Sequence, residues 1–469
     1  MVRSALLILS GNALASLLGL VRNLVLARLL GIEDYGIAAT FAISLAVVEM
    51  LSELGLRQMI VQDRQGDDPR LQATLQGFQL LRAAISATAL FLLAHPLAGF
   101  LGIPEVAWAY QVMALVPLLN GITHFDLNRV QRRMQFLPAV LGKTAPALAS
   151  VLLVWPLFLL FGDYRVMLYA ILAQWVLTAV ASHLLAERPF QLGLDPAILR
   201  RSLRFGWPIL VTAVLLFLVF HGEKLVVGRL LGMETLAIFA MGLTLSLTPI
   251  LVLTGSLNTF FLPQLSAAQD DAPRFNRIVR LCLEIHVAIA VAFALLLAWA
   301  GPAIVALLLG ERFAALGPLM LWLGLVVCVR FIRGTSELAA FSLGRTTSGL
   351  LGNLPRAAAM PVMWYALVET GSLTAMLWIA FVGELCGLAL TLLVLRRQPI
   401  AHLRPLLPTL AVGLGALACV AAAGLAALLP AAPEGLQMLA HLLAVALFAV
   451  NLMLARELRA HLGRLLGRG

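Results

Sequence analysis

The chain has 469 residues, of which 61% are hydrophobic and only 12% are charged, and its formal net charge is +10. Soluble proteins carry about twice this share of charged residues, so the composition excludes a set of soluble domains and predicts an integral membrane protein. The positive charge does not indicate nucleic-acid binding, because basic residues beside membrane spans follow the positive-inside bias and contact anionic membrane lipid.

The first membrane-length stretch, Leu6 to Gly36, contains an apolar helix that carries two arginines and is stopped by Gly31 and an acidic turn. When Arg22 is placed over Glu223, residues 22–39 match residues 223–240 at nine of eighteen positions. The matching charged and glycine positions are Arg28 and Arg229, Gly31 and Gly232, and Glu33 and Glu234. We interpret this match as an internal duplication, which predicts two similar bundles.

Fourteen apolar stretches of membrane-spanning length follow one another along the chain. Each is expected to be a helix, because lipid offers the backbone no hydrogen-bond partner. The predicted fold class is therefore an all-α integral membrane protein with fourteen transmembrane helices. The stretches are 4–30, 36–58, 73–94, 107–127, 138–160, 166–186, 206–231, 236–262, 281–300, 317–343, 349–369, 372–395, 406–429 and 436–455.

The longest polar linker, 187–205, coincides with the boundary of the duplication. It separates an N-terminal bundle of six helices, 1–186, from a C-terminal bundle of six helices, 206–395. Two appended helices and a basic tail occupy 396–469. Because each bundle has an even number of helices, the two are expected to be related by a pseudo-twofold axis along the membrane normal.

The basic residues predict the orientation. Of the 33 Lys and Arg, 23 fall in or at the edges of alternate connections, Arg57 and Lys143 among them, whereas only Arg165 and Arg312 fall in the opposite connections. The positive-inside bias therefore predicts that both termini are cytoplasmic.

Eight further basic residues lie within the predicted spans. A charge at bilayer depth is costly unless it is paired or faces water, so we expect these side chains to point into the bundles. Arg28 and Arg229 are near helix ends, where snorkelling to the interface explains them. The remaining six, with an asparagine on the face of Arg22, are candidates for a cationic cavity: Arg22, Arg82, Lys224, Arg330, Arg333, Arg356 and Asn12.

Structural alternatives stay open for several of these candidates. Small residues on the Arg22 face also suit close helix packing. Glu337 lies on the face of Arg330 and Arg333, so one of these arginines can belong to a structural ion pair. Arg356 is close enough to the cytoplasmic end to snorkel.

Embedded carboxylates are the usual carriers of a coupling ion in membrane transporters. Glu49 and Glu53 lie one helical turn apart, although neighbouring helices could simply neutralise them. The candidates for ion coupling or a gate are Glu49, Glu53, Glu223, His221 and Glu337. His124 and Asp126 are interpreted as ordinary solvated groups at the cytoplasmic edge.

Nothing in the sequence indicates an enzyme. The four cysteines fall in apolar stretches at unrelated spacings, which predicts neither disulfides nor a metal site. The chain carries no phosphate-binding glycine loop, no metal-ligand cluster and no nucleophile motif. We therefore expect no catalytic activity, no metal and no cofactor.

Three short stretches resemble a known family. The stretches GLVRNLVLARLLGIEDYG (19–36), VGRLLGMETL (227–236) and LNRVQRRMQF (127–136) are similar to the polysaccharide transport branch of the superfamily of multidrug, oligosaccharidyl-lipid and polysaccharide exporters. These relatives are the O-antigen-type and colanic-acid-type flippases.

The resemblance implies a flippase of the bacterial inner membrane. Such a protein moves an undecaprenyl-diphosphate-linked oligosaccharide from the cytoplasmic to the periplasmic leaflet, by alternating access around a cationic cavity and in exchange for H⁺ or Na⁺. Arg22 matches the position of a cavity arginine on the first helix. Glycosyltransferases and a polysaccharide polymerase are the partners that this function implies.

Two other functions compete with this interpretation. A cation-coupled multidrug exporter of the same superfamily would need acidic cavity residues, whereas eight embedded basic residues outnumber six embedded acidic ones here. A membrane glycan polymerase or ligase would need a folded segment outside the bilayer, and the predicted outer connections are short.

Overall fold

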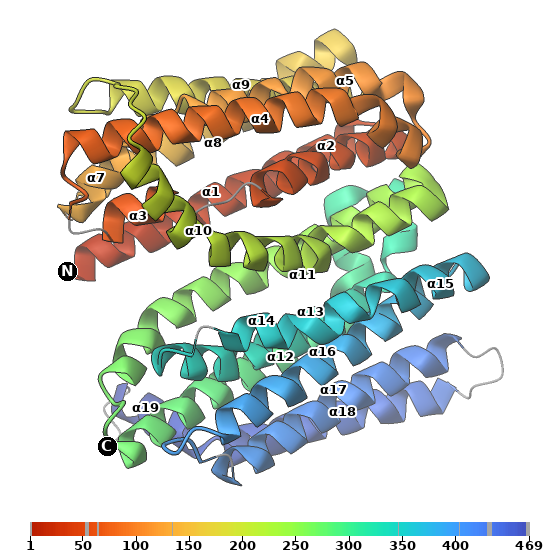
Figure 1. Cartoon of the computed structure of the whole chain (residues 1–469). Helices are drawn as coiled ribbons and strands as arrows, with labels where there is room; N and C mark the ends of the chain where they lie inside the picture. Colours follow the sequence, from red (N-terminus) through yellow and green to blue (C-terminus); the bar gives the residue numbers. More distant parts are fainter. Residues whose placement is uncertain are drawn as a thin grey trace. The chain divides into compact units, whose positions relative to one another are not determined.

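The computed structural model describes residues 2–51, 56–62, 65–133, 135–345, 347–402, 404–428 and 434–465. These residues form helices joined by short connections, and none of them forms a strand, so the predicted all-α fold class is confirmed for this part of the chain. The chain packs into two compact units, Met1–Met241 and Gly242–Gly469, whose helices are labelled in Figure 1.

The first unit contains the helices of the first half of the chain and the start of one long helix. They are α1 (Val2–Leu29), α2 (Ile32–Leu51), α3 (Leu56–Gln62), α4 (Pro69–Leu101), α5 (Ala107–Met113), α6 (Leu115–Gly121), α7 (Asp126–Arg132), α8 (Leu137–Phe161), α9 (Arg165–Leu184), α10 (Pro196–Phe217) and the beginning of α11 (Glu223–Ser266). A single π-helical turn, Leu218–Gly222, joins α10 to α11.

Within the described residues, the second unit contains the rest of α11, eight further α-helices and two short 3-10 helices, Glu311–Leu316 and Arg404–Leu406. The eight α-helices are α12 (Ala272–Leu309), α13 (Leu319–Ser342), α14 (Thr347–Ala358), α15 (Met360–Thr370), α16 (Leu373–Arg396), α17 (Leu407–Leu428), α18 (Glu434–Leu454) and α19 (Arg456–Leu465).

The helices follow the predicted spans. Every one of the fourteen stretches is helical over most of the residues that the structure describes in it. Within the described residues, nine helices are long and apolar enough to cross a bilayer, which makes the chain a multi-pass membrane protein. The full count of fourteen and the arrangement of six plus six helices stay predictions.

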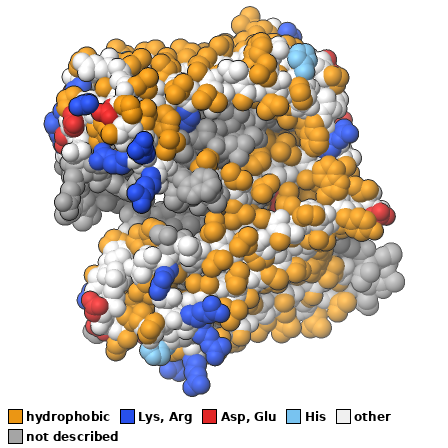
Figure 2. Space-filling model, viewed as in Figure 1, with side chains coloured by type: hydrophobic (Ala, Val, Ile, Leu, Met, Phe, Trp, Pro, Cys, Tyr) orange, Lys and Arg blue, Asp and Glu red, His pale blue; other side chains and the backbone are white. Residues whose placement is uncertain are grey.

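The surface of the first unit agrees with a bilayer environment. Leu92 on α4 and Leu159 and Leu160 on α8 are 68%, 70% and 75% exposed. Figure 2 shows hydrophobic side chains over much of the visible face of this unit, and Lys and Arg gathered at the end where α3 and α7 lie. Because water would disfavour so large an apolar surface, this face suits lipid.

Three long helices begin with an aspartate at the N-cap. The carboxylates of Asp68, Asp195 and Asp271 accept hydrogen bonds from backbone N–H groups in the first turns of α4, α10 and α12. The backbone N–H of Ala197 and the guanidinium of Arg70, 2.7 Å away, hold the pKa of Asp195 below its ordinary value. These caps start α4, α10 and α12 four to ten residues before the predicted spans, because the apolar stretch alone does not mark the first polar turn.

Both copies of the duplicated stretch interrupt a helix at the matching glycine. In the first copy α1 ends at Leu29, before Gly31. In the second copy Gly232 adopts φ +81° and breaks α11 internally, a conformation that glycine adopts without steric cost. The glycine that was predicted to stop the first stretch is therefore also the point at which the second copy bends.

Residues 187–195 pack against α4 within the first unit. The N–H of Gly193 donates to the carbonyl of Ala73 on α4 at 2.9 Å, and Gln76 Nε2 donates to the carbonyl of Gln191 at 2.8 Å. The helix that follows, α10, packs against α2 and α4. The compact units divide at Met241, inside α11; a boundary at 187–205 stays a prediction about the duplication.

Candidate functional site

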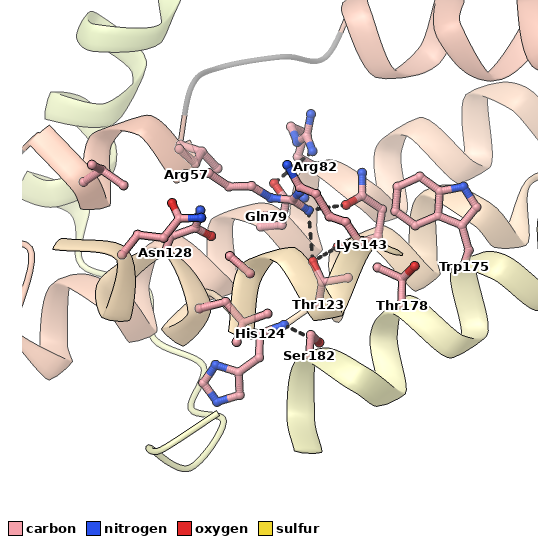
Figure 3. Close-up of a pocket in the computed structure, with 17 residues that line it drawn as sticks. Arg57, Gln79, Arg82, Thr123, His124, Asn128, Lys143, Trp175, Thr178 and Ser182 are labelled. Carbon is pink, nitrogen blue, oxygen red and sulfur yellow. Dashed lines mark hydrogen bonds between the residues drawn. The ribbon is translucent and has the colours of Figure 1, made fainter. Parts of the chain in front are cut away.

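The first unit contains a partly open cavity of about 530 Å³ with a largely polar lining, shown in Figure 3. It lies among six helices, α3, α4, α6, α7, α8 and α9, and the turn between α6 and α7. The residues that line it are Leu56, Arg57, Val61, Gln79, Arg82, Asn120, Thr123, His124, Leu127, Asn128, Gln131, Ala139, Gly142, Lys143, Trp175, Thr178 and Ser182.

Three cations from three helices point into this cavity. Figure 3 shows the charged ends of Arg57 from α3, Arg82 from α4 and Lys143 from α8 approaching the same part of it. None of the lining residues in the described part of the chain is acidic. The lining therefore carries three positive charges beside amides and hydroxyls, a composition that attracts an anion.

Neutral oxygen atoms orient the two arginines. Arg57 Nη2 donates to the amide oxygen of Asn120 and, at 3.0 Å, to the hydroxyl of Thr123. Arg82 Nη2 donates to the amide oxygen of Gln79 at 2.8 Å. Lys143 makes no hydrogen bond or ion pair with the described residues, and its charge interacts unfavourably with that of Arg57. Such repulsion between cations is relieved when an anion binds between them.

A buried ion pair holds the short helix α7 that forms one wall. Asp126 is completely buried, and its carboxylate accepts hydrogen bonds from Arg129 Nε at 2.5 Å and from the N–H of Glu187 at 2.8 Å. Arg129, 1% exposed, also contacts the Glu187 carboxylate at 2.7 Å. The interpretation of Asp126 as a solvated edge group is therefore wrong, because these donors replace water around the carboxylate.

His124 is buried beside this pair and lines the cavity. Its Nδ1 accepts a hydrogen bond from the backbone N–H of Asp126 at 3.1 Å, so Nδ1 carries no proton. Its Nε2 lies 2.9 Å from the carbonyl of Arg188 and therefore donates. This arrangement fixes the neutral tautomer with the proton on Nε2. His124 therefore contributes no charge to the cavity that it lines. The interpretation of His124 as a solvated group is also wrong.

Of the predicted cavity cations, the structure places only Arg82 in this lining. Arg22 lies elsewhere in the first unit: its Nη1 donates to Ser150 Oγ at 3.1 Å and to Gln174 Oε1 at 2.5 Å, which ties α1 to α8 and α9. Arg22 and Lys224 do not line the cavity. The side chain of Asn12 lies outside the described residues.

The predicted coupling groups are dispersed. His221 stacks on Phe217 at the junction of α10 and α11, and the adjacent Glu223 is 2% exposed; neither lines the cavity. Glu53 and the side chain of Glu49 lie outside the described residues. Glu337 belongs to the second unit, as do the remaining predicted cations Arg330, Arg333 and Arg356.

The arginines of the second unit form a buried ionic cluster. Arg330 Nη2 lies 2.6 Å from Oε1 of Glu384, a completely buried carboxylate on α16. Arg333 lies 3.3 Å from Glu337 and 3.7 Å from Glu384. Arg356, 2% exposed, also interacts with Glu384. The structure thus brings together four predicted residues: Arg330, Arg333 and Glu337 belong to an ion-pair network, and Arg356 is buried within electrostatic range of it.

Two glycines make room for this cluster. Arg333 also donates to the carbonyl of Gly352 and, at 2.8 Å, to the Asn353 side chain. A Cβ atom added at either Gly352 or Gly387 would lie 3.0 Å from Nη1 of Arg333. The guanidinium therefore joins α13, α14 and α16 through space that only glycines leave open.

Among the lining residues that sequence reasoning missed are Arg57, Lys143, Asn128 and Gln131. The first two were counted among the basic residues of cytoplasmic connections, because they lie at the ends of apolar stretches. The other two belong to the stretch 127–136, one of the three that carried the family resemblance, and α7 is built from its first half. That resemblance was the available signal.

The fold defines the class of protein. A solved structure of the lipid II flippase MurJ in an inward closed conformation has a TM-score of 0.68 and 11% identity, with 95% of this chain and 97% of that chain covered. A solved structure of a multidrug resistance MATE family transporter of the MOP superfamily, in an inward-facing conformation, has a TM-score of 0.62 and 15% identity. The match covers 81% of this chain and 93% of that chain. The chain is a multi-pass membrane protein with the fold that these structures share.

The family follows from the sequence itself. Residues 25–318 match the family model described as polysaccharide biosynthesis protein, and the chain belongs to this family. The resemblance inferred from the three stretches is thereby confirmed.

Named relatives agree with this membership. The succinoglycan biosynthesis transport protein ExoT of Rhizobium meliloti (strain 1021) is 26% identical over 388 residues, which cover 76% of this chain and 75% of ExoT. The lipopolysaccharide biosynthesis protein WzxC of Escherichia coli (strain K12) is 23% identical over 272 residues, which cover 55% of this chain and 53% of WzxC.

Proposed function

We propose that this chain is a flippase that moves an undecaprenyl-diphosphate-linked oligosaccharide from the cytoplasmic to the periplasmic leaflet of the bacterial inner membrane, by alternating access. The observation that carries the proposal is the cavity of the first unit, in which Arg57, Arg82 and Lys143 converge with no acidic residue in the described lining. Membership of the polysaccharide biosynthesis family and the names of ExoT and WzxC support it.

The cavity chemistry suits the proposed headgroup. A diphosphate carries negative charge that the membrane interior strongly disfavours unless cations and hydrogen-bond donors replace water around it. Guanidinium groups bind phosphate oxygens through paired hydrogen bonds, and an ammonium group adds a compact positive charge. The polyprenyl tail can stay in lipid while the diphosphate and glycan occupy the polar cavity.

The competing functions fit this site less well. A multidrug exporter with the same fold would carry organic cations, which three positive charges in the lining would repel. A glycan polymerase or ligase would need catalytic groups, and we assign none. We accordingly propose a transporter that receives its substrate from glycosyltransferases and delivers it to a polysaccharide polymerase.

We further propose that both termini are cytoplasmic, so that the end of the first unit bearing α3 and α7 opens toward the side on which the oligosaccharide is made. The excess of basic residues in those connections supports this orientation. Reporter fusions after Gly469 and within residues 301–316 should report opposite sides of the membrane; the same side for both would contradict it.

Exchange for H⁺ or Na⁺ is part of the proposal, with embedded carboxylates as the ion carriers. Glu223, buried at the junction of α10 and α11, is the candidate in the first unit. Transport by a Glu223→Gln variant should lose its dependence on the ion gradient; full dependence at normal protein level would remove Glu223 from the coupling site.

The test of the flippase proposal uses cells in which this chain is the only transporter for its substrate. Arg57→Ala and Lys143→Ala should each cause lipid-linked oligosaccharide to accumulate on the cytoplasmic leaflet, normalised to the amount of protein in the membrane. Arg200→Ala, which removes an exposed charge of α10 outside the cavity, is the matched control and should flip normally. Normal flipping by both cavity variants would contradict the proposal.

A further inference from the structure

The short helix α7 has two polar faces with different surroundings. Asp126 and Arg129, three residues apart, lie on one face and are buried in the ion pair with Glu187. Asn128 and Gln131, also three residues apart, lie on the opposite face and line the cavity. Figure 3 shows Asn128 on the side of the cavity where α7 lies, away from Trp175 and Thr178.

The two amides of the cavity face have unused hydrogen-bonding groups. The Asn128 and Gln131 side chains make no hydrogen bond with any residue that the structure describes. By contrast, the other two amides of the lining, Asn120 and Gln79, accept hydrogen bonds from the arginines. The cavity therefore contains amides that orient cations and a second pair that remains available to a ligand.

We infer that Asn128 and Gln131 form a sugar subsite, which recognises the hydroxyl groups of the oligosaccharide next to the diphosphate. This inference rests on the proposed function, in which Arg57, Arg82 and Lys143 bind the diphosphate.

The amides and the cations of the cavity suit different parts of the substrate. A primary amide both donates and accepts hydrogen bonds, and so does a sugar hydroxyl, whereas a fully ionised diphosphate only accepts. Amides thus suit the neutral, hydroxyl-bearing part of the substrate, and cations suit the anionic part. A cavity of about 530 Å³ lies within the usual range for sites that hold ligands larger than a diphosphate alone.

The anchored face of α7 gives the subsite its rigidity. Asp126 accepts backbone hydrogen bonds from both Glu187 and Arg188, so the helix is fixed to residues that follow α9 as well as to its own Arg129. A binding group held by a rigid element loses less freedom when the ligand binds. The buried pair therefore positions the two amides without contacting the ligand itself.

The experiment compares two probes on the purified full-length protein in nanodiscs. One probe is undecaprenyl diphosphate, and the other is undecaprenyl diphosphate bearing the oligosaccharide, extracted from cells that lack this transporter. The Asn128→Ala/Gln131→Ala variant should bind the glycosylated probe about tenfold more weakly, because about two hydrogen bonds are lost. Its affinity for the sugar-free probe should stay within about twofold.

Two further variants control for packing and for a general loss of amides. Gln131→Met keeps the length of the side chain without the amide and should also lose affinity only for the glycosylated probe. Gln135→Ala removes an exposed amide just beyond α7, outside the cavity lining, and should bind both probes normally.

The outcomes separate this inference from the proposed function. Arg57→Ala/Lys143→Ala should weaken binding of both probes; if it weakens neither, the proposed function fails. If that variant behaves as expected but the amide variant weakens both probes equally, or neither, the sugar subsite is overturned and the flippase proposal stands.

Discussion

The first and second units both contain buried or half-buried arginines, but the groups that hold these arginines differ. In the first unit, Arg57 and Arg82 donate to uncharged amide and hydroxyl oxygens at the edge of a cavity. In the second unit, Arg330 and Arg333 contact the carboxylates of Glu384 and Glu337. We therefore propose that the groups around an arginine, and not only its depth in an apolar stretch, decide whether it can bind a substrate anion.

This difference has an energetic consequence. Glu384 and Glu337 offset two of the three positive charges of Arg330, Arg333 and Arg356, so a further anion is expected to gain less there than in the cavity. Lys143 makes no ion pair with the described residues, so its positive charge stays available to a ligand in the cavity. We therefore expect substitutions in the second unit to reduce stability, and substitutions in the cavity to reduce binding.

The largest effect on stability is expected at Glu384. Glu384→Ala would remove the carboxylate that Arg330 and Arg333 contact and leave both arginines without it. The substitution should lower the free energy of unfolding by about 3–5 kcal/mol. Thermal unfolding of the detergent-purified protein measures this loss. Glu311→Ala, at an exposed position of the same unit, is the control. A stable Glu384→Ala protein that no longer transports would make the cluster a functional site.

A smaller loss of stability is expected at Arg22, which has neutral hydrogen-bond partners but does not line the cavity. Its hydrogen bonds to Ser150 and Gln174 join three helices, so Arg22→Ala should lower the free energy of unfolding by about 1–3 kcal/mol. Flipping should then fall only in proportion to the amount of folded protein in the membrane. Loss of flipping at normal abundance would instead return Arg22 to the substrate path that the family resemblance implies.

The smallest effect on stability is expected in the cavity itself. Lys143 has no hydrogen-bond partner among the described residues and interacts unfavourably with Arg57, so Lys143→Ala should leave the unfolding temperature unchanged or slightly higher. A clear decrease in that temperature would show that Lys143 has a structural role and would weaken the contrast between the two units.

Much of the fold was predictable from the sequence, because hydrophobic length marks membrane helices directly. The helix starts after Asp68 and Asp195 were missed. The first turns of α4 and α10 are polar, and a search for apolar stretches does not include them. The depth of Arg330 and Arg333 was also predictable. Their partner Glu384 was not, because it lies on another helix and a helical period gives only the facing of a residue, not the neighbour it meets.

The candidate site was predictable only in part. Arg82 was recognised because it lies deep in an apolar stretch. Arg57 and Lys143 lie at the ends of such stretches, where the positive-inside bias explains a basic residue equally well. Asn128 and Gln131 are uncharged, and only the tertiary structure shows that the Asp126 ion pair turns them toward the cavity.

The most direct test of the account is the affinity of the purified protein for undecaprenyl diphosphate, measured for a variant of each unit. Lys143→Ala should weaken binding about tenfold or more, since a charge-assisted contact to the diphosphate is lost. Arg330→Lys, which keeps the charge of the second-unit cluster, should bind within about twofold of the unaltered protein. Unchanged binding by Lys143→Ala together with a large loss in Arg330→Lys would contradict the account and place the headgroup in the second unit.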